Sequence, residues 1–314
     1  MLTPEQLEKH NTSITGSKVA SILGISPFKS RYLLWAEMTG LAEVNDISTE
    51  RMRMGSYAEA AIDEYCKHEL GWQIRKGNHT GKTHKDYPQF FGLIDRFKIE
   101  NGKRTAIIEY KNIDSLFKAQ WQDGPPAHYE AQCRFYSILY DLPCILVAVF
   151  GGNSAEVYHI ERNAEIETFI INECLKFWDM VQTMTAPEPD GSSTTADALA
   201  KLYPQNSLDM IDGNSSIETL INRYSLYAAI EKRAEEKKNE FGNKIKAIIG
   251  EHEGVVCESG AKATWKLTKP SAKFDEKQFA ADNPELYQKY VCVRPGYRRF
   301  NCTPAKPNTK QIAA

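Results

Sequence analysis

The clearest alternation of apolar and polar positions lies in residues 90–112. Two apolar runs, FFGLIDRFKI and AIIEYKN, flank a short polar turn that contains Gly102, and this pattern predicts a β-hairpin. In the second strand Glu109 and Lys111 are two residues apart, so both side chains point to one face of the sheet and Tyr110 points to the other. The pattern therefore brings a carboxylate and a lysine together on one face.

Helical spacing of apolar residues recurs on both sides of this hairpin. Six segments place apolar side chains three and four positions apart, and several begin or end at residues that commonly cap helices. Two further runs, CILVAVFG and AEVYHIE, predict strands joined by a turn at residues 151–153. The first of them is apolar throughout, as in an inner strand of a sheet that is covered on both faces. The predicted helices are residues 3–10, 16–24, 31–39, 54–70, 126–140 and 164–184.

A stretch rich in Pro, Gly and Ser, APEPDGSST, is the clearest domain boundary in the chain. Beyond it, Ser215 and Glu218 occupy capping-box positions of one long helix that ends at Gly250, and the largely charged middle of this helix suits solvent or a partner. A second hairpin, one or two short helices and a last strand, GYRRFNC, follow. We therefore expect a core in residues 1–185, a linker in 186–214, a C-terminal extension of long helix plus β-hairpin in 215–303, and a flexible tail in 304–314.

The composition narrows the choice of function only slightly. The chain has 314 residues, a formal net charge of −2 and a sequence pI near 6.4, so any contact with DNA would need a local basic surface. Its seven cysteines are scattered and lack a CxxC pair, which favours reduced thiols in the cytosol and argues against a zinc or iron–sulfur site. The chain has no run of about 18 apolar residues and a polar N-terminal start. We therefore expect a cytoplasmic protein without a membrane span.

Charged residues interrupt the predicted hairpin at positions where a protein core would not accept them. Asp95 lies in the first strand, and Glu109 and Lys111 lie near the end of the second. Because each unpaired buried charge costs free energy, two carboxylates and a lysine at neighbouring strand ends fit better around a divalent cation. A surface hairpin with a simple Glu–Lys pair is an equally good interpretation of these residues alone.

The order of four motifs along the chain favours the first interpretation. Asp95 followed by Glu109-Tyr110-Lys111 resembles the signature of the PD-(D/E)xK nuclease superfamily. Three further motifs narrow the resemblance to the YqaJ-type viral recombinase family, relatives of lambda exonuclease. They are ITGSKVASILGISPFKSRYLLWAEMTG with Ser17, G-x-x-x-E at Gly55 and Glu59, and Y-x-x-Q at Tyr129 and Gln132. The resemblance implies an α/β (α+β) fold with a restriction-endonuclease-like core, in which a central mixed β-sheet is flanked by helices, and a smaller C-terminal extension.

The same resemblance implies roles for individual residues. One or two Mg²⁺ ions, for which Mn²⁺ can substitute, are the implied cofactor, because hard oxygen ligands suit these ions. The implied metal ligands are Asp95, Glu109, the main-chain carbonyl of Tyr110 and, directly or through water, Glu59. Lys111 would orient or help to deprotonate the attacking water, or neutralise a phosphate oxygen, and Gln132 would help to position Lys111 or the nucleophile.

The resemblance also implies contacts with DNA. Ser17 matches a serine that holds a DNA phosphate at a helix start, and Tyr129 matches a residue that faces the substrate. Lambda exonuclease carries an arginine shortly before this serine that contacts the DNA 5′-phosphate, and His10 stands at the matching position here. Dependence on a 5′-phosphate therefore stays open. The cations that could take over from the arginine are Lys9, Lys18, Lys29 and Arg31.

The implied activity is that of a 5′→3′ exonuclease on double-stranded DNA ends in the cytosol of a bacterial or phage-infected cell. Such an enzyme leaves 3′ single strands for a single-strand annealing protein in phage-type recombination, and its relatives form homotrimers that encircle DNA. Two alternatives stay open: an endonuclease or nickase on the same core, and a catalytically quiet DNA-binding scaffold. The complete set of Asp95, Glu109 and Lys111 weighs against the scaffold.

Overall fold

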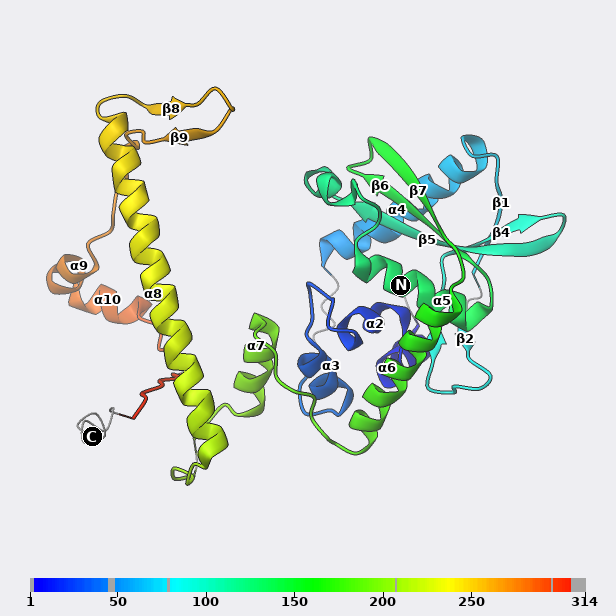
Figure 1. Ribbon diagram of the computed structural model, residues 1–314, viewed down its shortest axis with the longest axis horizontal. Coiled ribbons are helices and arrows are strands. Elements are labelled where there is room, and N and C mark those ends of the chain that lie inside the picture. Colours follow the sequence, from blue (N-terminus) through cyan, green and yellow to red (C-terminus); the bar gives the residue numbers. More distant parts are fainter. Residues whose placement is uncertain (1–2, 45–48, 78–79, 207, 295, 306–314) are drawn as a thin grey trace, which may run out of the picture. The chain divides into compact units, whose positions relative to one another are not determined.

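A computed structural model describes residues 3–44, 49–77, 80–206, 208–294 and 296–305 of the chain (Figure 1). The chain divides into two compact units, residues 1–203 and 204–314. Within the described residues, no helix combines the length and the apolar character that crossing a membrane requires.

The first unit is built on a five-stranded mixed sheet with the strand order β1-β4-β5-β6-β7. Strands β5 and β6 are parallel, and the other neighbouring pairs are antiparallel. A small separate sheet pairs β2 with β3. The strands are β1 (Gln73–Lys76), β2 (Lys82–Thr83), β3 (Phe91–Gly92), β4 (Arg96–Glu100), β5 (Lys103–Ile113), β6 (Cys144–Phe150) and β7 (Ser154–Ile160).

Helices cover both faces of the five-stranded sheet (Figure 1). Helix α4 (Glu50–His68) packs against β1 and β5, and helix α5 (Ala127–Tyr140) packs against β5, β6 and β7. Ile108 lies in a buried cluster with residues of α4, whereas Ile107 lies in the larger cluster with residues of α5, as strand alternation requires. The predicted fold class, a mixed central sheet flanked by helices, is confirmed. The other helices of this unit are α1 (Pro4–Thr12), α2 (Gly16–Ile22), α3 (Arg31–Met38), the 3₁₀ helix η1 (Ser115–Trp121), α6 (Ala164–Gln182) and α7 (Ser193–Leu202).

The predicted hairpin forms from β4 and β5. Asn101 and Gly102 both have positive φ, 49° and 75°, as a tight two-residue hairpin turn requires, and Asn-Gly is a pair that such turns favour. The first strand is shorter than expected, because β4 begins only at Arg96, while Phe91 and Gly92 form β3 and pair with β2 in the small separate sheet. The Tyr110 main-chain N–H donates a hydrogen bond to the Asp95 carboxylate at 2.8 Å. Just before the start of β4, this N–H is therefore bonded to a side chain.

The expected linker, residues 186–214, contains a helix of the first unit. In α7, Ser192 caps the N-terminus by accepting a hydrogen bond from the Thr195 N–H, and Ala198 is fully buried. The helix packs against α3, where the Ser30 N–H donates to the Thr194 hydroxyl at 3.0 Å. The Pro, Gly and Ser residues of the boundary therefore precede a packed helix, and the compact first unit extends to residue 203.

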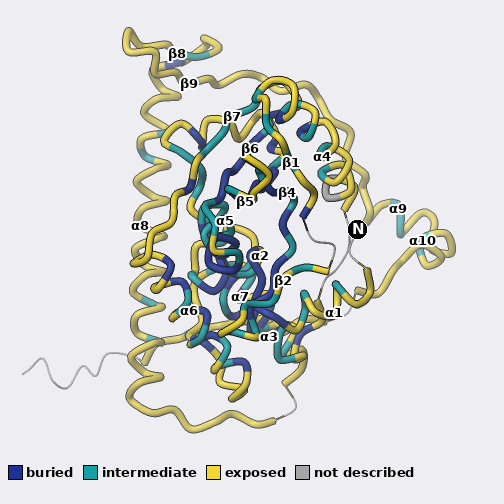
Figure 2. The backbone as a smooth tube through the Cα atoms, turned by 90° about the vertical axis from the view of Figure 1, so that its right-hand side faces the viewer, coloured by how far each residue is buried: buried dark blue, intermediate teal, exposed yellow. Residues whose placement is uncertain are grey.

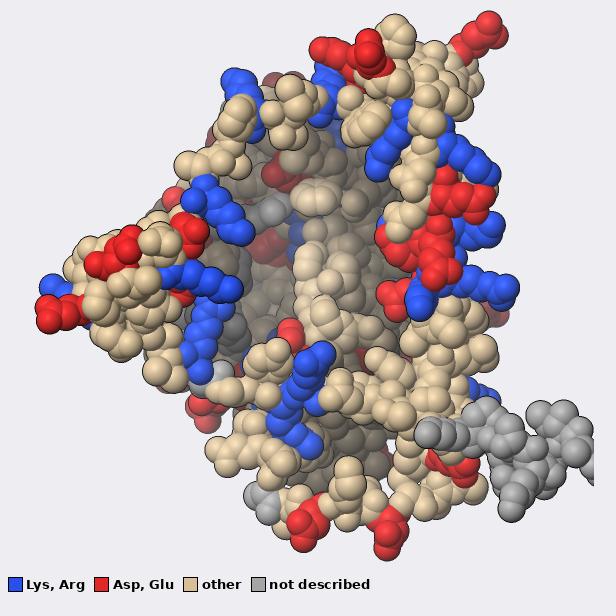
Figure 3. Space-filling view, turned by 90° about the vertical axis from the view of Figure 1, so that its left-hand side faces the viewer, with Lys and Arg blue, Asp and Glu red and all other residues tan. Residues whose placement is uncertain are grey.

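The second unit contains the predicted long helix and hairpin. Its elements are α8 (Ser215–Ile249), β8 (Gly254–Val256), β9 (Lys262–Thr264), α9 (Glu276–Asp282) and α10 (Pro284–Tyr290). The last strand that we predicted, over residues 296–302, does not form, since these residues have no regular secondary structure. Residues 306–314 of the predicted tail lie outside the described residues. Figure 2 shows α8 exposed along nearly its whole length, and on the face seen in Figure 3 basic side chains are interspersed with acidic ones.

Candidate active site

Three polar side chains form a closed set of hydrogen bonds between β5 and α5. Lys111 Nζ donates to Glu109 Oε1 at 2.8 Å and to Gln132 Oε1 at 3.0 Å. Gln132 Nε2 donates to the same Glu109 oxygen at 2.8 Å and to the Tyr136 hydroxyl at 3.2 Å. We call Glu109, Lys111 and Gln132 the active-site triangle.

Local geometry explains why these residues meet. Glu109 and Lys111 alternate with Tyr110 along β5, and the Tyr110 side chain packs in the buried cluster under α4 on the other face. Gln132 and Tyr136 are four residues apart, so they lie one turn apart on the side of α5 that faces the sheet. The predicted pairing of Glu109 and Lys111 on one face is therefore present, and α5 supplies its amide.

Asp95 brings a second carboxylate to this site. Its position ahead of β4 is fixed by the hydrogen bond from the Tyr110 N–H to Asp95 Oδ2. Burial raises the pKa of Asp95 above its ordinary value, although the Tyr110 N–H and the Lys111 charge oppose the shift. Glu109 is only 5% exposed, and burial, with a further contribution from the Asp95 charge, raises its pKa to about 7 against the opposing charge of Lys111. The charge of a single lysine thus opposes the upward pKa shifts of both carboxylates.

This donor set fits a hard divalent cation. Asp95 and Glu109 offer carboxylate oxygens, and Tyr110, whose main-chain N–H bonds Asp95, also offers a carbonyl. Mg²⁺ is commonly held by one or two carboxylates together with waters and substrate phosphates. Within the described ranges no three His, Cys, Asp or Glu side chains cluster closely enough to enclose a metal ion by themselves. A cation here would therefore rely on substrate and water for part of its ligand shell.

A buried polar network that we did not predict lies beneath Asp95. Arg96, with a side chain only 8% exposed, donates from Nε and Nη2 to the two carboxylate oxygens of Asp63 at 2.6 and 2.8 Å. Its Nη1 donates to the Asp95 main-chain carbonyl at 2.7 Å, and the Tyr110 hydroxyl donates to Asp63 at 2.9 Å. The Arg96 network therefore ties α4 to the chain on both sides of the hairpin. The sequence signal for it was an arginine directly after Asp95, at a strand position that the structure buries.

Glu59 faces the same arginine. It lies one turn before Asp63 on α4, and its carboxylate is 3.6 Å from Arg96 Nη1. Burial raises the pKa of Glu59, and the charge of Asp95 raises it further, so the two carboxylates are electrostatic neighbours. Glu59 and Asp63 are four residues apart on α4, and both carboxylates face Arg96.

Tyr129 forms part of the wall beside the active-site triangle. Its ring stacks on that of Trp121, with 5.2 Å between centroids and an angle of 28° between ring planes. Lys111 Nζ lies 5.5 Å from the Tyr129 ring centroid. The predicted Y-x-x-Q pair thus contacts Lys111 through both members, the amide by a hydrogen bond and the ring by its face.

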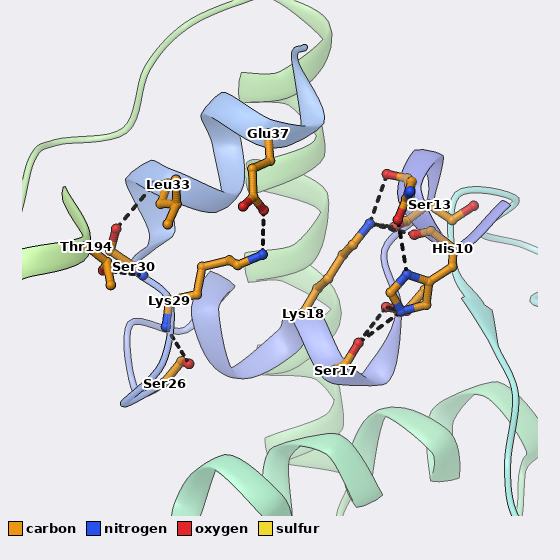
Figure 4. A network of polar contacts seen from close by, with 12 residues as sticks. His10, Ser13, Ser17, Lys18, Ser26, Lys29, Ser30, Leu33, Glu37 and Thr194 are labelled. Carbon is orange, nitrogen blue, oxygen red and sulfur yellow. Dashed lines mark hydrogen bonds and ion pairs between the residues drawn. The ribbon is translucent and has the colours of Figure 1, made fainter. Parts of the chain in front are cut away.

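Ser17 lies at the start of α2, in a second polar group that includes His10 (Figure 4). The Ser17 hydroxyl is 3.2 Å from His10 Nε2 and 3.1 Å from the Thr15 hydroxyl. This helix start approaches the site closely, because a Cβ added at Gly16 would lie 2.7 Å from the Tyr136 ring. Tyr136 in turn accepts a hydrogen bond from Gln132, so this side chain lies next to both Gly16 and the active-site triangle.

Three of the cations that we considered for phosphate binding, Lys18, Lys29 and Arg31, bind to other groups of the protein. Lys18 Nζ donates to main-chain carbonyls at the end of α1, at 2.6 to 2.9 Å. Lys29 pairs with Glu37 of α3 (Figure 4), and Arg31 pairs with Glu173 of α6 at 3.3 Å. A DNA phosphate would therefore have to compete with an acidic partner for Lys29 or Arg31.

The match to a family model supports the motif analysis. Residues 5–139, which contain every predicted site residue, match the YqaJ-like viral recombinase domain. The uncharacterized protein YqaJ of Bacillus subtilis (strain 168) is 27% identical over 314 residues, which span 96% of this chain and 94% of that protein. Two solved structures share 18% identity over 58% of this chain and 94% of theirs. They are an alkaline exonuclease (LHK-Exo) from Laribacter hongkongensis, with a TM-score of 0.48, and LHK-Exo in complex with dAMP, with a TM-score of 0.49.

Proposed function

We propose that this chain, whose residues 5–139 match the YqaJ-like viral recombinase domain, is a metal-dependent nuclease that hydrolyses phosphodiester bonds in DNA. The observation that carries the proposal is the active-site triangle beside Asp95, where Lys111 donates a hydrogen bond to the buried Glu109 and burial raises the pKa of both Glu109 and Asp95. Perturbed carboxylates in such a place are more common at functional sites than in structural cores.

Each residue of the site has a distinct task in this mechanism. Asp95, Glu109 and the Tyr110 carbonyl would hold Mg²⁺, which when bound stabilises the negative charge that develops on the scissile phosphate. The Tyr110 N–H holds Asp95 in place, and Gln132 holds Glu109 and Lys111 at a fixed separation. Lys111 has three N–H donors. Two serve Glu109 and Gln132, and the third can be donated to the attacking water or to a phosphate oxygen.

The Arg96 network supports this site from below. Arg96 donates a hydrogen bond to the Asp95 carbonyl and pairs with Asp63 and Glu59 of α4. It therefore holds the main chain at Asp95 against α4. Preorganised groups of this kind do not need to rearrange when the reaction proceeds. Glu59 would contribute through its charge or through a water molecule.

The finer parts of the proposal concern substrate and assembly. We assign the chain a 5′→3′ exonuclease activity on duplex DNA ends, in the cytosol, with 3′ single strands handed to an annealing protein and with a ring of three subunits around the DNA. The proximity of the α2 start to Tyr136 supports a phosphate contact near Ser17. The seven free cysteines are in keeping with a reducing compartment.

A digestion assay on matched DNA substrates tests this proposal. Linear duplex DNA with 5′-phosphate or 5′-hydroxyl ends and covalently closed circular duplex are each incubated with the protein and Mg²⁺. We expect steady loss of the linear duplex and an untouched circle, because an end-dependent enzyme needs a terminus. The two kinds of 5′ end then report whether His10, in place of arginine, removes the dependence on a 5′-phosphate.

Two results would contradict the proposal at different levels. Nicking or cutting of the circle would replace the exonuclease by an endonuclease on the same site. An intact linear duplex with Mg²⁺ and with Mn²⁺ would leave a DNA-binding scaffold as the better description. A chelator should stop the expected digestion, because it removes the cation that stabilises the negative charge on the scissile phosphate.

A further inference from the structure

Helix α8 presents exposed apolar groups along one side, and no element among the described residues covers them. The helix has 35 residues, which makes it about 52 Å long, and most helices of this kind owe their stability to packing of an apolar face. Figure 2 shows almost all of it as exposed. One apolar group lies at each end, with exposures that range from 37% at Ile217 to 75% at Ile248. The two groups are Ile217, Leu220 and Tyr224, and Phe241, Ile245 and Ile248.

The spacing of these residues is that of a coiled-coil seam. Intervals of three and four residues alternate without interruption from Ile217 to Ile248, through positions 227, 231, 234 and 238. Residues in such a sequence lie along one side of a helix that pairs with another helix. A 35-residue segment holds five heptads, which is long enough for a stable pair.

The order of apolar and polar residues along the seam is nearly the same from either end, and this symmetry favours a second copy of α8 as the partner. In an antiparallel pair of two α8 helices, Ile217 lies opposite Ile248, Leu220 opposite Ile245, and Tyr224 opposite Phe241. The two residue numbers of every layer have a constant sum, as pairing about one two-fold axis requires. Each end of the seam therefore meets an apolar group of its own kind and size.

Charged residues at the centre of the seam disfavour a parallel pair of helices. A parallel pair in register would place Glu231 against Glu231 and Lys238 against Lys238, and like charges at a seam are destabilising. The antiparallel pair places Lys238 opposite the ring of Tyr227, a cation–π arrangement, and Glu231 opposite Ala234. Glu231 then also lies about one helical turn from Lys238 of the other copy.

We propose that α8 is a self-association surface, on which a second copy of this chain docks its own α8 in antiparallel orientation. The segment after α10 leaves room for this partner. Phe300 contacts the Tyr224 ring edge-on at 5.4 Å, and Cys302 contacts the Ile221 carbonyl, yet Tyr224 stays 52% exposed. This segment flanks the seam at its N-terminal end and would border the docked helix.

The molar mass of the full-length chain in solution tests this pairing. Light scattering after size-exclusion chromatography should give the wild-type chain twice the mass of a Leu220→Glu variant, because the new charge falls in two symmetric layers of the pair. Leu226→Glu is the matched control, since Leu226 is an exposed leucine of the same helix that lies off the seam. Its mass should equal that of the wild type. If the first unit forms a ring of three, two rings joined by three such pairs give the same ratio of two.

Disulfide cross-linking tests the orientation independently of the mass. Two differently tagged chains, Leu220→Cys and Ile245→Cys, are made in a background with Cys257→Ser, Cys292→Ser and Cys302→Ser, which removes the thiols that are not buried. Mild oxidation of the mixture should yield the cross-link between the two different chains, and little product from either chain alone. Cross-linking of each chain with itself would contradict the antiparallel pair. Equal masses of wild type and Leu220→Glu, with no cross-link in the mixture, would show that something other than a second copy covers the seam. Neither test measures DNA cleavage, so the outcome of both tests is independent of the proposed nuclease activity.

Discussion

The Lys111→Met variant should lose at least about a hundredfold in the rate of DNA hydrolysis while remaining folded. Methionine keeps the length of the side chain but removes the donors that Lys111 offers to Glu109, Gln132 and the substrate. The fold should survive because Glu109, with a pKa raised to about 7 by burial, can take up a proton when the ammonium group is gone. The measurement is the initial rate of nucleotide release from linear duplex DNA in saturating Mg²⁺.

A second lysine serves as the control for this variant. Lys176 lies on α6 with its side chain 66% exposed, paired with Glu173 three residues earlier. Lys176→Met changes the net charge by the same amount but should hydrolyse DNA at a rate close to that of the wild type. Wild-type activity in Lys111→Met would remove the active-site triangle from the mechanism.

The Asp63→Ala variant should be destabilised by about 3–5 kcal/mol, the cost of removing one partner from a buried ion pair. Arg96 would keep its charge in a place where its side chain is only 8% exposed, and the Tyr110 hydroxyl would lose its acceptor as well. Urea denaturation followed by near-ultraviolet circular dichroism measures this loss as a lower midpoint at an unchanged slope.

Two further variants make this result interpretable. Glu64 is the next residue of α4 and pairs with Lys67 at the surface, so Glu64→Ala should leave the midpoint nearly unchanged. The double variant Asp63→Leu with Arg96→Met should regain part of the stability, because it removes both buried charges together. A midpoint for Asp63→Ala equal to that of the wild type would show that the Arg96 network does not hold α4 to the hairpin.

Much of the site could be predicted from the sequence because its residues are close together in local structure. Strand alternation placed Glu109 and Lys111 on one face, and the Asn-Gly turn returned the chain so that Asp95 met Tyr110. The role of Gln132 could be predicted only from the family resemblance, because its position in the helix indicates no more than a place next to a buried stripe. The structure joins it to Lys111 by a hydrogen bond.

The parts that we did not predict depend on contacts between distant segments. Asp63 has the sequence environment of an exposed helix residue, and its role becomes visible only where α4 crosses the sheet above Arg96. Helix α7 follows a segment whose composition favours a linker, and packing against α3 stabilises it. The last predicted strand did not form, because β-propensity in residues 296–302 has no neighbouring strand to pair with among the described residues.

The central claim, that Asp95 and Glu109 form a cation site, is tested most directly by calorimetric titration of Mg²⁺ and Mn²⁺ into the wild-type chain and Asp95→Asn. Asparagine keeps an oxygen for the Tyr110 N–H but removes the charge, and Asp86→Asn, at an exposed surface position, is the control. The account predicts that the wild type and Asp86→Asn bind the cations and that Asp95→Asn loses this binding. Equal binding by all three proteins would contradict it, because the cation would then lie elsewhere.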